Sequence, residues 1–237
     1  MQQEITREIA AKVVAVVDAG LVQGQGRPVP GQMCVEAAVC FALGLPHGDD
    51  PACVSPALRR LKIGLNDRAW SSNAARAKGL RRLAVAQLGS AGVLDDREFM
   101  RRVAEMTIRK AVPIGLRAAA KLNPKHATAL EAAAVRCEQE GTRAACEHAR
   151  ATARAAAAAA AAYASAYASA YAADAAYAAA AYASAYAAAD AAAASSADAR
   201  TRDRVLAEYA EHVVQILVDM GAPGVQWLDL VPLEGAA

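Results

Sequence analysis

The sequence predicts an all-α protein, and three features carry this prediction. The tract from Ala151 to Ala199 is almost entirely alanine, the residue with the highest helix propensity. Elsewhere, apolar residues recur at helical spacing, as in Ile5, Ile9 and Val13. Capping residues, glycines and prolines separate these periodic segments. We therefore expect a helical N-terminal body, a long Ala/Tyr-rich helix or helical hairpin, and a C-terminal helix that docks back.

The first half of the chain contains four expected helices. The first covers residues 4–19 and stops at Gly20, and the second covers 32–43, where Glu36 is almost the whole polar face. Ser55 and Pro56 begin the third, as an N-cap serine followed by a proline at the first helical position. The fourth follows Ser71 or Ser72 and ends at residues 88–89.

The second half is expected to contain longer helices. One begins at Asp95 or Asp96, and Pro113 should break or kink it because proline lacks the N–H that the helix needs. From residue 125 a helical pattern continues into the alanine tract, weakened only at Gly141. The last helix covers 202–220, and the apolar tail at 225–233 is expected to dock on the body in an extended form.

The alanine tract carries six tyrosines that a helical wheel places within one half of its surface. No Leu, Ile, Val, Phe or Met occurs from Arg136 to Arg204, so this region must pack with methyl groups and phenol rings. Three interpretations remain open: a helix pair or bundle, a solvated helical spacer, and an ice-binding helix resembling the type I antifreeze proteins, from which it differs in lacking regular threonines. The expected interaction face consists of Tyr163, Tyr167, Tyr171, Tyr177, Tyr182 and Tyr186.

The charge is distributed unevenly although the formal net charge is only +2. Residues 1–54 carry a net charge of about −3, residues 55–125 about +11 and residues 126–237 about −6. Arginines on short helices could neutralise nucleic-acid phosphates, or they could pair with the acidic flanks. The candidate nucleic-acid-binding residues are Arg59, Arg60, Arg76, Arg81, Arg82, Arg101, Arg102 and Arg109.

One cluster contains metal-ligating residue types, namely Cys34, His47, Asp49 and Cys53. Its spacing matches no established zinc pattern, and buried cysteines beside an Asp-rich turn explain it better. The sequence contains no nucleophile elbow, zinc-protease helix or nucleotide-binding loop. We therefore expect no cofactor, and enzymatic activity has no support in the sequence.

The stretch PGQMCVEAAVCFALGLPHGDDPACVSPALR and the ending PGVQWLDL, at Pro223 to Leu230, carry a resemblance to known sequences. They resemble a group of bacterial and phage-encoded proteins that combine an alanine-rich helix, interrupted by aromatic residues, with a PGxxWLDL-type tail. The resemblance covers most of the chain. It implies no activity and assigns no catalytic or binding residue.

These observations predict three regions: a helical body at 1–135, an Ala/Tyr-rich element at 136–200, and a C-terminal helix and tail at 201–237. The expected function is a non-enzymatic scaffold or interaction module that associates through its Ala/Tyr helix with a protein partner or a second copy. The alternatives are a nucleic-acid binder using the helices of residues 55–125 and, third, a metal or enzyme site around Cys34 and Cys53. The absence of a signal peptide or a membrane-spanning stretch predicts a cytoplasmic location, with no membrane partner.

Overall fold

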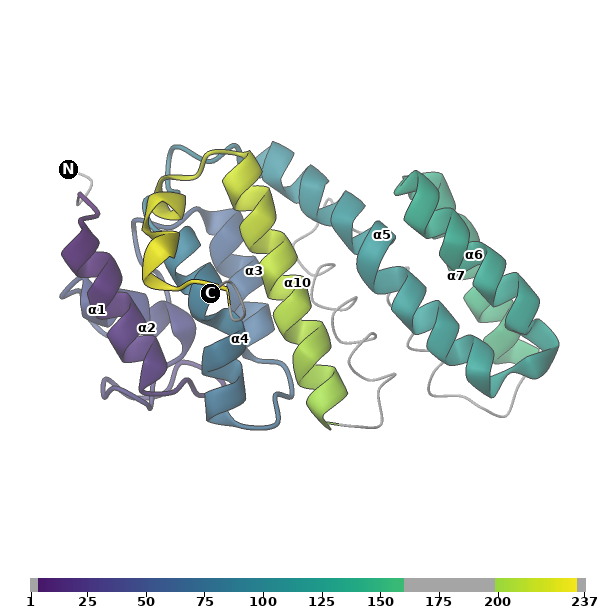
Figure 1. The fold of residues 1–237 in the computed structure, drawn as a ribbon, viewed down its shortest axis with the longest axis horizontal. Helices are drawn as coiled ribbons and strands as arrows, with labels where there is room; N and C mark the ends of the chain where they lie inside the picture. Colours follow the sequence, from purple (N-terminus) through teal and green to yellow (C-terminus); the bar gives the residue numbers. More distant parts are fainter. Residues whose placement is uncertain (1–3, 160–198, 234–237) are drawn as a thin grey trace. The chain divides into compact units, whose positions relative to one another are not determined.

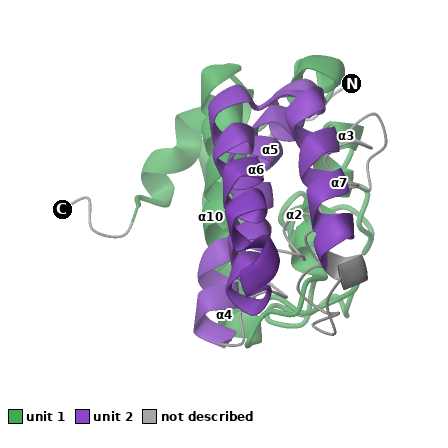
Figure 2. Ribbon diagram, turned by 90° about the vertical axis from the view of Figure 1, so that its right-hand side faces the viewer, with its two compact units in different colours: residues 1–99, 206–237 green, residues 100–205 purple. Residues whose placement is uncertain are grey.

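The computed structural model describes residues 4–159 and 199–233, and within them every regular element is helical, as expected. The chain forms two compact units: unit 1 comprises residues 1–99 and 206–237, and unit 2 comprises residues 100–205 (Figure 2). Unit 1 is therefore built from both ends of the chain, which confirms the expectation that the C-terminal helix returns to the N-terminal body. The division also places residues 100–135, which we had assigned to that body, with the alanine-rich part of the chain.

Unit 1 contains four helices from the N-terminal half: α1 (Arg7–Asp18), α2 (Val35–Ala42), α3 (Pro56–Asn66) and α4 (Asn73–Ala86) (Figure 1). Each begins at a side-chain cap, in order Thr6, Cys34, Ser55 and Ser72, which accepts a hydrogen bond from an N–H of the first turn. The later part of α10 (Ala199–Asp219) and the 3-10 helix η2 (Pro223–Leu230) complete the unit.

The core of unit 1 consists mainly of large aliphatic side chains from these helices. Helix α1 contributes Val13 and Val17, and the fully buried leucines include Leu58, Leu65, Leu80, Leu83, Leu206 and Leu217. Glu36 was expected to form the polar face of its helix, but its side chain is completely buried. The expected polar face does not reach solvent, because helices α1, α3 and α4 all contact α2 and cover Glu36.

Two buried polar side chains attach the glycine-rich loop between α1 and α2 to the helices. Asn66 accepts a hydrogen bond from the backbone N–H of Val35 at 3.2 Å and donates one to the carbonyl of Val22 at 2.9 Å. Arg76 donates to the carbonyls of Leu21, at 3.0 Å, and of Asn66, at 2.7 Å. The loop is thus held by side chains that satisfy its backbone groups.

The C-terminal tail docks on unit 1, but as a 3-10 helix and not in the extended form expected. Gly224 permits the approach, because a Cβ there would lie 2.4 Å from the carbonyl oxygen of Val85 in α4. Arg7 of α1 donates a hydrogen bond to Asp229 at 2.5 Å, and Arg82 of α4 donates to the carbonyl of Val231. The tail is therefore part of the packing of unit 1.

Unit 2 contains most of α5 (Asp96–Leu122), the short η1 (Pro124–His126), α6 (Ala127–Glu140) and α7 (Arg143–Ala159). Helix α5 is not broken at Pro113 but continues through it to Leu122. The buried core of unit 2 contains mainly alanine and cysteine, with a few larger aliphatic side chains. Its members are Ile108, Val112, Leu116, Ala119, Leu130, Ala133, Ala134, Cys137, Ala145, Cys146, Ala149, Ala153 and Ala156. Alanines at these positions let the helix backbones approach closely.

Gly141 ends α6 and separates it from α7. The sequence predicts one continuous helix here, weakened at Gly141, so this prediction is wrong. The φ of Gly141, +61°, is the left-handed conformation in which glycine ends helices, and Thr142 then caps α7 by accepting from the N–H of Ala145. Arg109 of α5 donates to the last carbonyls of α6, those of Glu138, Gln139 and Glu140, at 2.7–2.9 Å. A glycine followed by a capping threonine therefore produces a helical hairpin.

Candidate functional site

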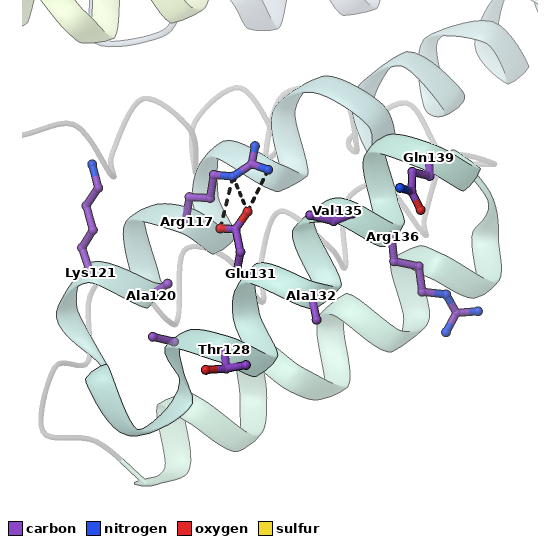
Figure 3. Close-up of a pocket in the computed structure, with 10 residues that line it drawn as sticks. Arg117, Ala120, Lys121, Thr128, Glu131, Ala132, Val135, Arg136 and Gln139 are labelled. Carbon is purple, nitrogen blue, oxygen red and sulfur yellow. Dashed lines mark hydrogen bonds and ion pairs between the residues drawn. The ribbon is translucent and has the colours of Figure 1, made fainter.

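Helices α5 and α6 of unit 2 form an open groove with a volume of about 860 Å³ (Figure 3). Helix α6 supplies one wall through residues that recur at three- and four-residue spacing on one face, and α5 supplies the other through one turn. The floor consists of small apolar side chains. The lining residues are Arg117, Ala120, Lys121, Ala127, Thr128, Glu131, Ala132, Val135, Arg136 and Gln139.

The two faces of α6 differ in composition. One face, with Leu130 and Ala133, is completely buried in the core of unit 2. The face toward the groove is mixed: it presents Ala132 and Val135 among polar side chains, and 36% of Val135 is exposed. The groove therefore offers small apolar side chains between polar ones as a surface for another element.

Ion pairs fix the charged rim of the groove. Arg117 donates to Glu131 at 3.0 Å and to Glu138 at 2.5 and 2.9 Å, so one guanidinium joins α5 to two turns of α6 (Figure 3 shows the pair with Glu131). The hydrogen bonds that Arg117 donates to Glu138 and Glu131 raise its pKa, and its guanidinium in turn lowers the pKa of Glu138. Arg136 pairs with Glu140 at 2.8 Å, on the same helix.

The predicted tyrosine face lies outside the described residues. Tyr163, Tyr167, Tyr171, Tyr177, Tyr182 and Tyr186 all fall within residues 160–198, which directly follow the end of α7 at Ala159. The interaction face therefore stays a prediction from sequence. The groove was not predicted; the exposed Ala132 and Val135 of the helix at 127–140 were the sequence signal for it.

Most of the predicted nucleic-acid-binding arginines form contacts within their own unit. In unit 1, Arg59 pairs with Asp50, Arg81 donates to both oxygens of Asp18 at 2.6 and 2.8 Å, and Arg82 pairs with Glu211 at 2.9 Å. Arg76 is buried and donates to backbone carbonyls. These contacts correspond to the alternative in which the arginines pair with acidic residues of the chain.

The remaining candidates lie on α3 and α5. Glu105 accepts from both Arg101, at 3.4 Å, and Arg109, at 3.1 Å. Arg60 is exposed and Arg102 is half-buried. The structure therefore does not gather the eight arginines on a single surface of either unit.

The four predicted metal candidates are separated by burial. Cys34 and Cys53 are buried, whereas His47 and Asp49 are exposed, and His47 lies 3.2 Å from the carbonyl of Gly26. Cys34 uses its sulfur to cap α2, 3.3 Å from the N–H of Ala37. In the described part of the chain, no group of three or more His, Cys, Asp or Glu residues could hold a metal ion.

Comparison of the chain with protein-family models, curated proteins and solved structures found no match. Among residues 4–159 and 199–233, no helix has the length and apolar character needed to cross a membrane. The groove and the ion pairs of unit 2 are thus the features from which a function can be argued.

Proposed function

We propose that this protein is a non-enzymatic helical interaction module, in which the groove of unit 2 binds the Ala/Tyr helix of a second copy. The observation that carries the proposal is the open groove between α5 and α6, which small apolar side chains such as Ala120, Ala132 and Val135 help to line. Tyrosine suits such a surface, since its ring buries apolar area while its hydroxyl reaches polar groups at the edge.

Charge supports the pairing of groove and tract. The groove is lined by three cationic side chains, Arg117, Lys121 and Arg136, and one carboxylate, Glu131. Residues 160–198 contain Asp174, Asp190 and Asp198 and neither Lys nor Arg. Arg117 and Arg136 already pair with Glu131, Glu138 and Glu140, so the attraction between groove and tract is carried mainly by Lys121.

Length supports a second copy as the source of the helix. The tyrosines extend from Tyr163 to Tyr186, about 35 Å along a helix at 1.5 Å per residue. Helix α6, with 14 residues, is only about 21 Å long on the same basis. One groove cannot cover the whole tyrosine face, so the remainder is available to the groove of another molecule.

The oligomeric state of the full chain tests this proposal. Sedimentation should show a concentration-dependent oligomer that Ala132→Arg dissociates, because arginine places a charge and a long side chain on the groove floor. Ala144→Arg is the matched control, since Ala144 is an exposed alanine on α7 that does not line the groove. Replacing Tyr167, Tyr171 and Tyr182 together with serine should dissociate the oligomer as well.

Two results would contradict the proposal. One is a wild-type chain that remains monomeric up to about 100 μM, a concentration that would populate even a weak dimer. The other is an oligomer that Ala132→Arg leaves intact. Mixed samples of isotopically heavy and light chains, with a photocrosslinker at position 132, would show directly whether the tract in the groove comes from another copy.

A further inference from the structure

Unit 1 contains a polar cluster that is completely enclosed. It consists of Glu36 of α2, Lys62 of α3 and Gln87 at the C-terminal cap of α4, and no part of the three residues is exposed. Lys62 Nζ lies 3.3 Å from Glu36 Oε2, and Gln87 Nε2 donates to the same oxygen at 3.4 Å. Both distances are at the long end of the range for a hydrogen bond or ion pair.

These contacts leave the cluster with unused hydrogen-bonding groups. Glu36 Oε1 and Gln87 Oε1 are buried acceptors without a partner, and Lys62 Nζ is a buried donor that forms an ion pair but no hydrogen bond of good geometry. The two oxygens thus each need a hydrogen-bond donor, and the ammonium group of Lys62 needs an acceptor. Folded proteins rarely leave buried polar atoms in this state, and ordered water is the usual remedy.

The unused groups lie close to one another. Lys62 Nζ and the amide of Gln87 both approach Glu36 Oε2, and Glu36 Oε1 belongs to the same carboxylate. Gln87 Oε1 likewise belongs to the amide whose nitrogen makes the contact. The three unpaired atoms therefore all lie near the Glu36 carboxylate, where α2, α3 and α4 meet.

The chemistry of the missing partner follows from this set of atoms. A cation would be repelled by Lys62 and an anion by Glu36, so a neutral molecule suits the ion pair. Water donates two hydrogen bonds and accepts one or two, which meets the needs of both oxygens and of the ammonium group. We propose that unit 1 holds one internal water molecule, bound by Glu36, Lys62 and Gln87 where α2, α3 and α4 meet.

This water would do more than satisfy isolated atoms. It would bridge groups on three separate helices, so that each helix contributes one hydrogen bond to a shared centre. It would also offer a path by which a proton passes between the carboxylate and the amine. The proposal is independent of the groove and of its occupant.

A crystal structure of the full chain at a resolution that shows ordered water tests the proposal. We expect a density peak at hydrogen-bonding distance, about 2.6–3.2 Å, from Glu36 Oε1, Gln87 Oε1 and Lys62 Nζ. The double variant Glu36→Leu with Lys62→Met should lose the peak, because apolar side chains of similar volume replace two of its three partners. Wild-type density in which a rotated Gln87 amide pairs directly with both neighbours, and no water is present, would overturn the proposal.

Solution measurements on the wild-type chain provide a second test that needs no variant. A long-lived internal water should give nuclear Overhauser cross-peaks to the Gln87 side-chain amide, with the sign of a molecule that tumbles with the protein. The exposed side-chain amide of Gln25 serves as the control, since it contacts rapidly exchanging solvent. A Gln87 amide without such a cross-peak would also overturn the proposal.

Discussion

Units 1 and 2 are both built from helices, but they are stabilised in different ways. Unit 1 buries large leucines and valines, and it also buries an ion pair and two polar side chains that hold its loop. The core of unit 2 is largely alanine, and its named charged side chains pair at the surface, as between Arg117 and Glu138. The comparison teaches that the alanine-rich core of unit 2 allows close helix packing without burying charged side chains. The core of unit 1 buries Glu36 and Lys62, whose charges must be compensated by partners inside the protein.

The largest effect should come from breaking the buried ion pair of unit 1. Above the pKa of about 7 that Glu36 has in the folded chain, Lys62→Met leaves the Glu36 carboxylate buried without its counter-charge, and we expect a loss of about 3–5 kcal/mol in the free energy of unfolding. Trp70 and Trp227, the two tryptophans of the chain, both belong to unit 1, so their fluorescence during urea unfolding measures this loss.

The matched control is the double variant Glu36→Leu with Lys62→Met, which removes both charges and should be close to wild type or more stable. If Lys62→Met alone is as stable as wild type, the pair contributes nothing to unit 1 and the proposed contrast between the units fails.

The same pair should make the stability of unit 1 depend on pH. Burial raises the pKa of Glu36 from its ordinary value of 4.5 to about 7, and it lowers the pKa of Lys62. The charged groups around Glu36 also include Arg59 and Asp49. Between about pH 4.5 and 7 the folded chain holds a proton at Glu36 that the unfolded chain has released, so stability should fall as the pH rises through this range.

Urea unfolding at pH 5 and pH 7.5, followed by tryptophan fluorescence, measures this dependence. Glu36→Gln should remove most of the difference between the two pH values, because the amide does not titrate. A difference that persists unchanged in Glu36→Gln would assign the pH dependence to other groups.

In unit 2, the corresponding weak point is a small residue and not a charge. Ala133 is completely buried in the core formed with α5 and α7, and Ala133→Leu should cost about 1–3 kcal/mol by overpacking it. Hydrogen exchange of the amides in α6 and α7 should report the loss, whereas the tryptophan transition of unit 1 should not move. Ala144→Leu, at an exposed position on α7, provides the control and should change the stability by no more than about 0.5 kcal/mol.

The smallest effect should follow from the surface ion pairs of unit 2. Arg117 and Glu138 are each 39% exposed, so water and salt screen their interaction, and we expect about 0.2–1 kcal/mol for the coupling of the pair. A double-mutant cycle with Arg117→Ala and Glu138→Ala, at about 50 mM and 500 mM salt, measures this coupling and its screening. A coupling above about 3 kcal/mol would show that unit 2 relies on charge as strongly as unit 1.

Much of this fold was predictable because local signals suffice for helices. Ser55 with Pro56 and Ser72 mark helix starts by the hydrogen bonds they offer, and both starts are where the sequence places them. Gly141 was misread because alanines on either side continue the helical pattern, so the turn depended on the glycine and Thr142 alone. The conformation of the tail was not predictable, since it depends on Gly224 meeting α4, far away in the sequence.

The candidate sites were harder to predict because they, too, depend on contacts between residues far apart in the sequence. A hydrophobic pattern shows that Glu36 belongs to a buried helix, but only the packing of α3 brings Lys62 against it. The arginines of the basic region were expected either to bind nucleic acid or to pair with the acidic flanks, but the sequence could not identify partners such as Asp18 and Glu211, which lie tens or more than a hundred residues away. Partners so distant in sequence are set by tertiary structure and not by spacing.

The two-part construction of unit 1 also has a consequence for the order in which the chain can fold during its synthesis. Unit 2 is continuous in sequence, whereas unit 1 needs residues 206–233 to cover Val85 and Ala86 and to pair Arg7 and Arg82 with the tail. A ribosome makes those residues more than a hundred residues after α4, so the early helices leave the exit tunnel well before this part of their core exists. Helices α1 to α4 must therefore wait, with their leucines incompletely covered, until the later segment has been made.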